Sequence, residues 1–362
     1  MKCKWFEAIE FVFKISCFLV VFIMFGLWIK KYIDDEDVCL VDYQPFTEVP
    51  DQLVPELSIC FRHPFLQEKF KGLEFDVNAS TYLEHLTGKV FQQPYNQIDY
   101  NNITLNLEDY FLSKRVVWRN GSISSNTNVE LRSTFSGFIH YFFVKCFTTD
   151  TKTLNIPAVR LIRYDFKNEV LMDYRKASDH SWGLSVHGPN QFLLQQQNFR
   201  SFSRNNNKSN GLSVDVRISK IEVLKRRNKR KEPCVTEWNR WDDLIVLKPI
   251  EKIGCSAPYH RSFNEFSVCS RKEDMRALYN EWFKVKNKFE HPPCLGTPRI
   301  DARFLFNHIK EINELTKNTN IFRVFVRYPE QVMLITQTQS INGQAVIGNI
   351  GGYIGLFLGI YY

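Results

Sequence analysis

Cysteines are the residues of this chain whose chemistry is most readily assigned. There are nine. Cys3 and Cys17 lie at or inside an N-terminal apolar segment. The others lie between the two apolar ends of the chain: Cys39, Cys60, Cys146, Cys234, Cys255, Cys269 and Cys294. This density predicts disulfides formed in an oxidising compartment, and the lack of any Cys-x-x-Cys pair argues against a zinc ribbon.

Glycosylation sequons occupy the same middle region of the chain. Asn-x-Ser/Thr triplets begin at Asn78, Asn102, Asn120 and Asn207. A single sequon is common by chance, but several beside many cysteines favour an extracellular and glycosylated middle. The sequence therefore predicts that the bulk of the chain faces the outside of the cell.

The C-terminal stretch intersperses glycine with apolar residues. Gly351, Gly355 and Gly359 recur at every fourth position and form one smooth stripe on a helix. In lipid such a stripe lets helix backbones approach closely. A soluble core helix or a loose apolar tail is the alternative. From Ile350 to the C-terminus a helix measures about 20 Å, less than the roughly 30 Å of hydrocarbon. We therefore expect 345–362 to be the start of a truncated second transmembrane helix.

The N-terminal segment is apolar over most of residues 11–29. Lys14 lies one turn inside, from where its side chain reaches back to the headgroups. A signal peptide is the alternative, but the run is long, no small-x-small site follows, and Lys30 and Lys31 come next. The sequence predicts a cytosolic segment at 1–10 and a transmembrane helix at 11–29.

The region 30–344 has the pattern of a β-rich domain with inserted helices. Alternating runs predict strands at 138–147, 158–164, 182–187, 212–224 and 321–328. Amphipathic periodicity predicts helices at 272–289 and 301–316. Residues 66–135 are polar, carry three of the sequons, and are expected to form a solvent-exposed insertion. The expected fold class is an α+β membrane protein.

Three separated motifs resemble one family. They are the Pro-led strand Val54-Pro55-Glu56-Leu57-Ser58-Ile59-Cys60-Phe61-Arg62-His63-Pro64-Phe65, the segment Cys146-Phe147-Thr148-Thr149, and the glycine-rich 348–359. Their order and spacing resemble the epithelial sodium channel/degenerin family, the amiloride-sensitive sodium channels. The resemblance covers nearly the whole chain.

The resemblance implies a trimer in the plasma membrane, formed with the same or related subunits. Each subunit would have two membrane helices and an extracellular palm, finger and thumb, with 66–135 finger-like and 234–294 thumb-like. The pore would lie between the second helices and pass sodium, with no cofactor.

Disulfide pairs also follow from the resemblance. By position, Cys60 would pair with Cys146. Four cysteines remain for the thumb and allow three pairings. The ladder of disulfides in the family's thumb favours the nested one, Cys234 with Cys294 and Cys255 with Cys269. Cys39 is left without a partner.

Pore residues can be placed on the same basis. A cation filter needs oxygen ligands on the axis and little bulk. Gly359 would offer its carbonyl, while Gly352 and Gly355 would allow close helix contact. Asn349 would meet hydrated ions at the mouth, or cap the helix N-terminus. Two departures from the family stand out. No His precedes the first span, and Tyr361 stands where the Gly-x-Ser filter has Ser.

Two charged runs admit two readings each. Much of the net charge of +8 lies at 225–231, which is a single run rather than a nucleic-acid-binding face. The run is either a solvated loop or a convertase site, since Arg227, Lys229 and Arg230 fit the Arg-x-Lys-Arg pattern. The acidic run 34–37 either attracts cations to a vestibule or is a solvated collar.

Three functions compete at this stage. The leading one is a sodium channel subunit gated by an unknown stimulus. The second is a type II single-pass membrane glycoprotein such as a glycosyltransferase, which predicts an Asp-x-Asp motif that the middle of the chain does not offer. The third is a non-conducting family member that modulates partner subunits. No Ser-His-Asp or Cys-His constellation, phosphate loop or metal-ligand cluster is visible, so we expect no enzyme.

Overall fold

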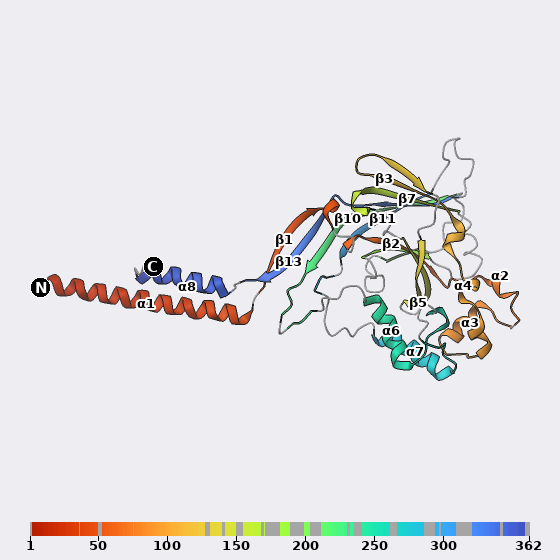
Figure 1. The fold of residues 1–362 in the computed structure, drawn as a ribbon, viewed down its shortest axis with the longest axis horizontal. Helices are drawn as coiled ribbons and strands as arrows, with labels where there is room; N and C mark the ends of the chain where they lie inside the picture. Colours follow the sequence, from red (N-terminus) through yellow and green to blue (C-terminus); the bar gives the residue numbers. More distant parts are fainter. Residues whose placement is uncertain are drawn as a thin grey trace.

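The computed structural model shows two long helices projecting from a body of two sheets and a helical layer (Figure 1). Helix α1 (Lys2–Asp34) opens the chain, and α8 (Gly343–Leu358) lies beside it near the C-terminus (Figure 1). The structure describes residues 2–35, 37–49, 53–74, 76–126, 131–139, 142–149, 155–167, 170, 182–188, 199–202, 211–229, 232–234, 241–260, 266–285, 294–296, 298–308, 321–340 and 343–358.

The larger sheet has eight strands in the order β1-β13-β10-β12-β7-β3-β4, with β11 paired to β10. Its strands are β1 (Asp37–Pro45), β3 (Phe111–Trp118), β4 (Ile123–Asn126), β7 (Val159–Lys167), β10 (Gly211–Lys225), β11 (Arg299–His308), β12 (Ile321–Arg327) and β13 (Gln331–Gln339). In β12 the side chains alternate between a buried inner face and a more exposed outer face, as a period of two requires. Val214, Val324 and Ile162 are completely buried on the inner face.

The smaller sheet has five strands in the order β5-β6-β2-β8-β9. They are β2 (Glu56–Arg62), β5 (Leu131–Ile139), β6 (Phe142–Thr149), β8 (Trp182–His187) and β9 (Phe199–Phe202). Strand β2 is buried on both faces, because Ile59 belongs to the core between the sheets while Cys60 faces a second core. The Pro-led motif of the sequence thus forms a central strand.

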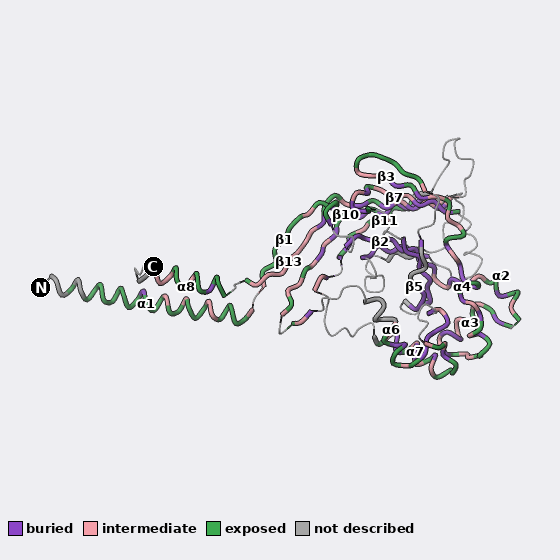
Figure 2. Tube along the Cα trace, viewed as in Figure 1, coloured by how far each residue is buried: buried purple, intermediate pink, exposed green. Residues whose placement is uncertain are grey.

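The second core lies between the smaller sheet and a layer of helices (Figure 2). The helices are α2 (Gln67–Phe70), α3 (Ala79–Leu86), α4 (Tyr100–Ile103), α6 (Trp241–Ile253) and α7 (Lys272–Val285). Aromatic rings fill this core, and Phe143, Tyr82 and Tyr95 are at most 1% exposed. The indole of Trp282 in α7 donates to the carbonyl of Phe138 in β5 at 2.8 Å and so ties helix to sheet.

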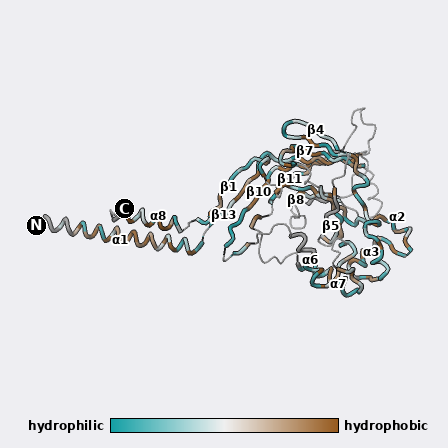
Figure 3. The backbone as a smooth tube through the Cα atoms, in the orientation of Figure 1, coloured by the Kyte–Doolittle hydropathy of each residue, from teal (hydrophilic) through white to brown (hydrophobic). Residues whose placement is uncertain are grey.

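Helix α1 exposes apolar side chains over most of its surface. Phe11, Phe22 and Ile23 are between 60% and 67% exposed. The segment Ala8–Asp34 is, among the described residues, the one helix long and apolar enough to cross a membrane. Much of the helix is accordingly brown in Figure 3. Lys14 pairs with Glu10 one turn earlier, at 2.7 Å.

Four of the predicted strands correspond to β7, β8, β10 and β12, and the predicted helix at 272–289 to α7, which ends at Val285. The run 138–147 is not one strand, because β5 ends at Ile139 and β6 begins at Phe142. The two strands pair antiparallel, with Phe138 opposite Phe143. An apolar run that continues through a tight reversal gives no sign of the turn.

The predicted helix at 301–316 is wrong over its described part. Residues 299–308 form β11, which pairs antiparallel with β10. Ile300, Ala302 and Phe304 alternate onto the core between the sheets. Pairing along β10 outweighs the helical periodicity of the segment. Residues 309–316 lie outside the described part of the chain.

The expectation that residues 66–135 are an exposed insertion is also wrong. Tyr82, Tyr100 and Ile103 are buried in the second core. Strand β3, from the same segment, pairs with β7 inside the larger sheet. The segment is polar on average, yet its aromatic and aliphatic residues build a core of their own.

Gly88 lets the end of α3 approach α7 closely. It has a φ of +68°, and a Cβ on it would meet the backbone nitrogen of Arg276 at 2.7 Å. Gly121, in the β3–β4 turn, has a φ of +86° and open space around it. Both Gly→Ala variants force an L side chain into the left-handed region, but only Gly88→Ala adds a clash.

We expect Gly88→Ala to lose about 1–3 kcal/mol more unfolding free energy than Gly121→Ala, the usual cost of overpacking. Chemical denaturation of the two variants and the parent chain measures this difference. Equal losses would contradict the close packing of α3 on α7.

Candidate functional site

Both long helices lead into the same pair of strands. Helix α1 ends at Asp34 and β1 begins at Asp37, while β13 ends at Gln339 shortly before α8. Strands β1 and β13 pair antiparallel over their full length, with Asp37 opposite Gln339. The ribbon of β1 and β13 therefore connects both helices to the larger sheet (Figure 1).

Four charged residues lie at the junction of α1 and β1, and we call them the clasp. The guanidinium of Arg227 lies 2.5 Å from Asp35 and 2.9 Å from Asp37. The ammonium of Lys229 lies 2.6 Å from the other oxygen of Asp37. Arg227 also donates to the backbone carbonyl of Asp35 at 3.2 Å. A segment just after β10 thus holds the turn that connects α1 to the sheet.

The backbone of the turn favours this arrangement. Asp35 has a φ of +54°, a left-handed conformation that Asp tolerates better than most residues. It follows the last turn of α1, where unpaired carbonyls make the helix end electronegative. A cation such as Arg227 complements both the helix end and the carboxylates.

The contacts of the clasp favour the charged forms of Asp37, Arg227 and Lys229. Burial acts to raise the pKa of Asp37, but hydrogen bonds from Lys229 and Arg227 prevail and lower it. The hydrogen bond to Asp35 raises the pKa of Arg227, and the hydrogen bond to Asp37 raises the pKa of Lys229. All partners are partly exposed, so salt is expected to weaken the clasp.

The clasp brings together the acidic run 34–37 and the basic run 225–231. The basic run was expected to be a solvated loop or a cleavage site, and the acidic run a vestibule or a collar. In the structure, Arg227 and Lys229 are engaged by Asp35 and Asp37, so neither run is simply solvated. Arg230 lies outside the described residues. The one signal in the sequence was the opposite charge of the two runs.

Three disulfides cross-link the body of the protein. Cys60 and Cys146 are bonded and lie directly opposite each other on β2 and β6. Cys234 is bonded to Cys294, and Cys255 to Cys269. These are the three pairs that the family resemblance implies. Cys39 is exposed and unpaired, and Cys17 is unpaired within α1.

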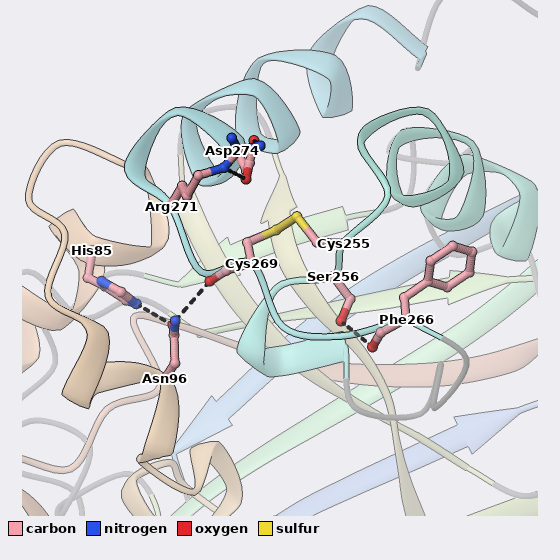
Figure 4. The surroundings of a disulfide bond; sticks show 8 residues. All are labelled: His85, Asn96, Cys255, Ser256, Phe266, Cys269, Arg271 and Asp274. Atoms are coloured by element: carbon pink, nitrogen blue, oxygen red, sulfur yellow. Dashed lines mark hydrogen bonds and ion pairs between the residues drawn. A yellow bond between two sulfur atoms is a disulfide. The ribbon is translucent and has the colours of Figure 1, made fainter.

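The Cys255–Cys269 bond also connects to the α3 region (Figure 4). The amide of Asn96 donates to the carbonyl of Cys269 at 2.8 Å, and its oxygen lies 2.9 Å from the ring nitrogen of His85. This chain of contacts fixes the loop between α6 and α7 against the neighbouring helices.

Asn349 does not cap α8. The helix begins at Gly343, so Asn349 lies within it and is half-buried. The N-cap alternative is therefore wrong, and the placement in a pore stays a prediction. Gly359 and Tyr361 lie outside the described residues, so the structure does not bear on the expected filter.

Three glycines of α8 have open space beside them among the residues that the structure describes. A Cβ added at Gly348, Gly351 or Gly352 would meet no heavy atom within 4 Å. No contact within the described part of the chain explains glycine at these positions. Close approach by another helix is the usual reason for such a stripe in lipid.

The described sequons are accessible. Asn78, Asn102 and Asn120 are all exposed. Asn78 caps α3 through its oxygen, which accepts from the backbone of Thr81 at 3.0 Å. That contact leaves its amide nitrogen available for glycan attachment. Asn207 lies outside the described residues.

A cavity of about 710 Å³ was not anticipated from the sequence. Lys145, only 2% exposed, contributes to its wall and donates to the hydroxyl of Thr104 at 2.9 Å. Burial lowers the pKa of Lys145 to about 8, against the opposing influence of Glu108, Asp109 and Asp99. A single Lys within a strand sequence does not indicate that its side chain is buried in the wall of a cavity.

His187 is sealed inside the smaller sheet. Its Nε2 lies 2.7 Å from the hydroxyl of Ser58, and its Nδ1 lies 2.7 Å from the carbonyl of Gly188. The Ser58 hydroxyl in turn lies 2.5 Å from that of Thr148. Ser58 and His187 are at most 2% exposed, so this pair presents no surface to a substrate.

Acid is expected to destabilise the fold through His187. Burial lowers its pKa to about 4, while the hydrogen bond to Gly188 acts in the opposite direction. An unfolded His has a pKa of about 6.5, so the unfolded chain binds more protons between these values. The free energy of unfolding should fall as pH drops through that window, by up to about 1.4 kcal/mol per pH unit.

The variant His187→Gln removes this proton and should flatten the pH dependence. Denaturant unfolding of both chains at pH values from about 7 to 5 measures the change in slope. His260, whose pKa burial lowers to about 3, supplies a parallel contribution that remains in the variant. An unchanged slope would show that His187 does not titrate on unfolding.

Comparisons with known proteins give little direct guidance. No protein-family model matches the chain, and no curated protein matches it. Among solved structures it is similar to one described as a cryo-EM structure of a proton-activated chloride channel. The match covers 98% of this chain and 94% of the other, with 6% sequence identity and a TM-score of 0.32. A TM-score this low does not establish a shared fold and assigns no ion to this chain.

Proposed function

We propose that this chain is a subunit of a trimeric, stimulus-gated cation channel that carries sodium passively across the plasma membrane. Helices α1 and α8 lie in the bilayer, and the two sheets with their helical layer lie outside the cell. The proposal builds on the resemblance of the Pro-led strand, the Cys-aromatic-Thr motif and the glycine-rich C-terminal stretch to the amiloride-sensitive sodium channels.

The observation that carries the proposal is the open glycine face of α8 beside an apolar α1. A Cβ added at Gly348, Gly351 or Gly352 would meet no described heavy atom within 4 Å, and α8 packs beside α1. In a trimer these glycines let three copies of α8 approach one axis. Asn349 and Gly355 are then placed to line the pore.

Three further features support an extracellular body. The exposed sequons at Asn78, Asn102 and Asn120 are accessible to glycan transfer. The three disulfides require an oxidising compartment. Ala8–Asp34 is long and apolar enough to anchor the chain. The sequons and the disulfides support an extracellular position of the sheets, and the apolar helix supports a membrane anchor.

Purification into lipid nanodiscs tests the assembly. We expect a particle with three chains, and Gly351→Leu should reduce that species because a large side chain blocks helix approach. Ile347→Leu is the matched control, since Ile347 lies on the same helix, is 73% exposed and keeps its size. A monomer in lipid, or equal assembly of the two variants, would overturn the proposal.

A further inference from the structure

The outer face of the larger sheet carries a group of six arginines, which we call the arginine face. Each belongs to the set of residues that alternate away from the buried side of its strand. They are Arg115 on β3, Arg163 on β7, Arg323 and Arg327 on β12, Arg217 on β10 and Arg303 on β11. Strands from distant parts of the sequence therefore gather one residue type on one surface.

The strand register places arginines directly beside one another. Arg217 lies opposite Arg327 on one side and Arg303 on the other, so three neighbouring strands carry a row of guanidinium groups. Arg115 lies opposite Arg163 in a second pair. Neighbouring strands are about 4.8 Å apart, and like charges directly opposite one another destabilise a sheet. Because this arrangement costs the sheet stability, it suggests that the arginines serve to bind a ligand.

Two aspartates neutralise part of the charge. Asp165 accepts from Arg163 at 2.6 Å and from Arg323 at 2.7 Å. Asp215 accepts from Arg217 at 3.0 Å and from Arg327 at 2.9 Å. Each carboxylate is about 10% exposed or less and holds two guanidinium groups in place.

The remaining charge is unbalanced. Arg115 and Arg303, at the two sides of the face, are exposed and make no ion pair with any residue that the structure describes. Six guanidinium groups therefore face two carboxylates. Further along β10, positive and negative side chains are balanced, because Lys220 pairs with Glu222 and lies opposite Asp301.

We propose that the arginine face binds a linear sulfated polysaccharide. Guanidinium groups match sulfate and carboxylate oxygens with paired hydrogen bonds. The charges lie in rows across a sheet rather than around a pocket, which suits an extended chain of anions. The inference rests on the extracellular placement proposed above, because such polymers are found outside cells.

The apolar groups on the face argue against a folded protein as the partner. Phe325 is half-buried among the arginines, and Leu305, at 43% exposure, lies two strands away. Protein interfaces centre on a closely packed apolar core, whereas here apolar and charged groups alternate. An acidic polypeptide is the alternative occupant, and the experiment separates the two.

The test measures binding of a heparin-derived oligosaccharide to the full chain in nanodiscs. We expect Arg115→Gln with Arg303→Gln to weaken binding at least tenfold and to reduce the slope of log affinity against log salt by roughly two contacts. Lys71→Gln with Lys89→Gln removes the same charge from exposed positions in the helical layer and should have little effect.

Three results would overturn the inference. They are equal binding by the two double variants, equal binding of the desulfated oligosaccharide, and tighter binding of polyglutamate than of the sulfated probe. Arg115 and Arg303 make no described ion pair, so their variants should unfold at the parent temperature. Because binding is scored without ion flux, its failure is distinguishable from failure of the channel proposal.

Discussion

Replacing Cys60 and Cys146 together by Ala is expected to lower the free energy of unfolding by about 4 kcal/mol. The bond closes a sequence separation of 86 residues, and loop-closure entropy in the unfolded chain grows with that separation. Both cysteines are at most 1% exposed, so water cannot fill the space that the two sulfur atoms leave. Denaturant unfolding under non-reducing conditions measures the loss.

Two further cysteine variants serve as controls for this prediction. Cys39→Ala changes an exposed, unpaired cysteine and should leave the stability unchanged. Removing Cys255 and Cys269, separated by 14 residues, should cost about 3 kcal/mol because the closed loop is short. If the Cys60–Cys146 pair proved less important than this short loop, the pairing of β2 with β6 would not be a central element of the fold.

Breaking the clasp with Asp37→Asn is expected to expose the segment after β10 to trypsin. The substitution removes the carboxylate that both Arg227 and Lys229 contact. Proteolysis follows the fraction of molecules in which the segment is open. If the ion pairs stabilise the closed segment by about 1.4 kcal/mol, their loss raises that fraction, and the cleavage rate, about tenfold. Mass spectrometry of fragments ending at these residues gives the rate.

The matched control lies in the same segment. Glu232 is 79% exposed and lies 3.8 Å from Lys229, so Glu232→Gln removes a peripheral contact of equal charge. We expect the control to be cut at nearly the parent rate. Equal rates for the two variants would mean that the clasp does not restrain the segment, and the proposed link between sheet and α1 would fail.

Regular alternation made three strands of the larger sheet predictable, namely β7, β10 and β12. The strand predicted at 212–224 corresponds to β10, because its apolar residues alternate onto one buried face. The segment 301–316 was predicted as a helix rather than a strand, yet Ala302 and Phe304 alternate onto the core as strand residues do. Only pairing with β10 decides between them, and pairing is not a local property.

Neither the clasp nor the arginine face could be predicted from the sequence, and the reason is the same for both. Arg227 and Asp35 are separated by 192 residues, and the row of Arg327, Arg217 and Arg303 exists only through strand register. Composition shows the charges but not their neighbours. The disulfide pairs were accessible through the family resemblance, whereas cysteine positions alone leave several pairings open.

The reversal potential of the current carried by the full chain in a planar bilayer tests the account most directly. A sodium chloride gradient gives sodium and chloride equilibrium potentials of opposite sign. The proposal predicts a reversal potential close to that of sodium and a current blocked by amiloride. A reversal potential close to that of chloride, or a bilayer that never conducts, would contradict the assignment of the chain as a sodium channel subunit.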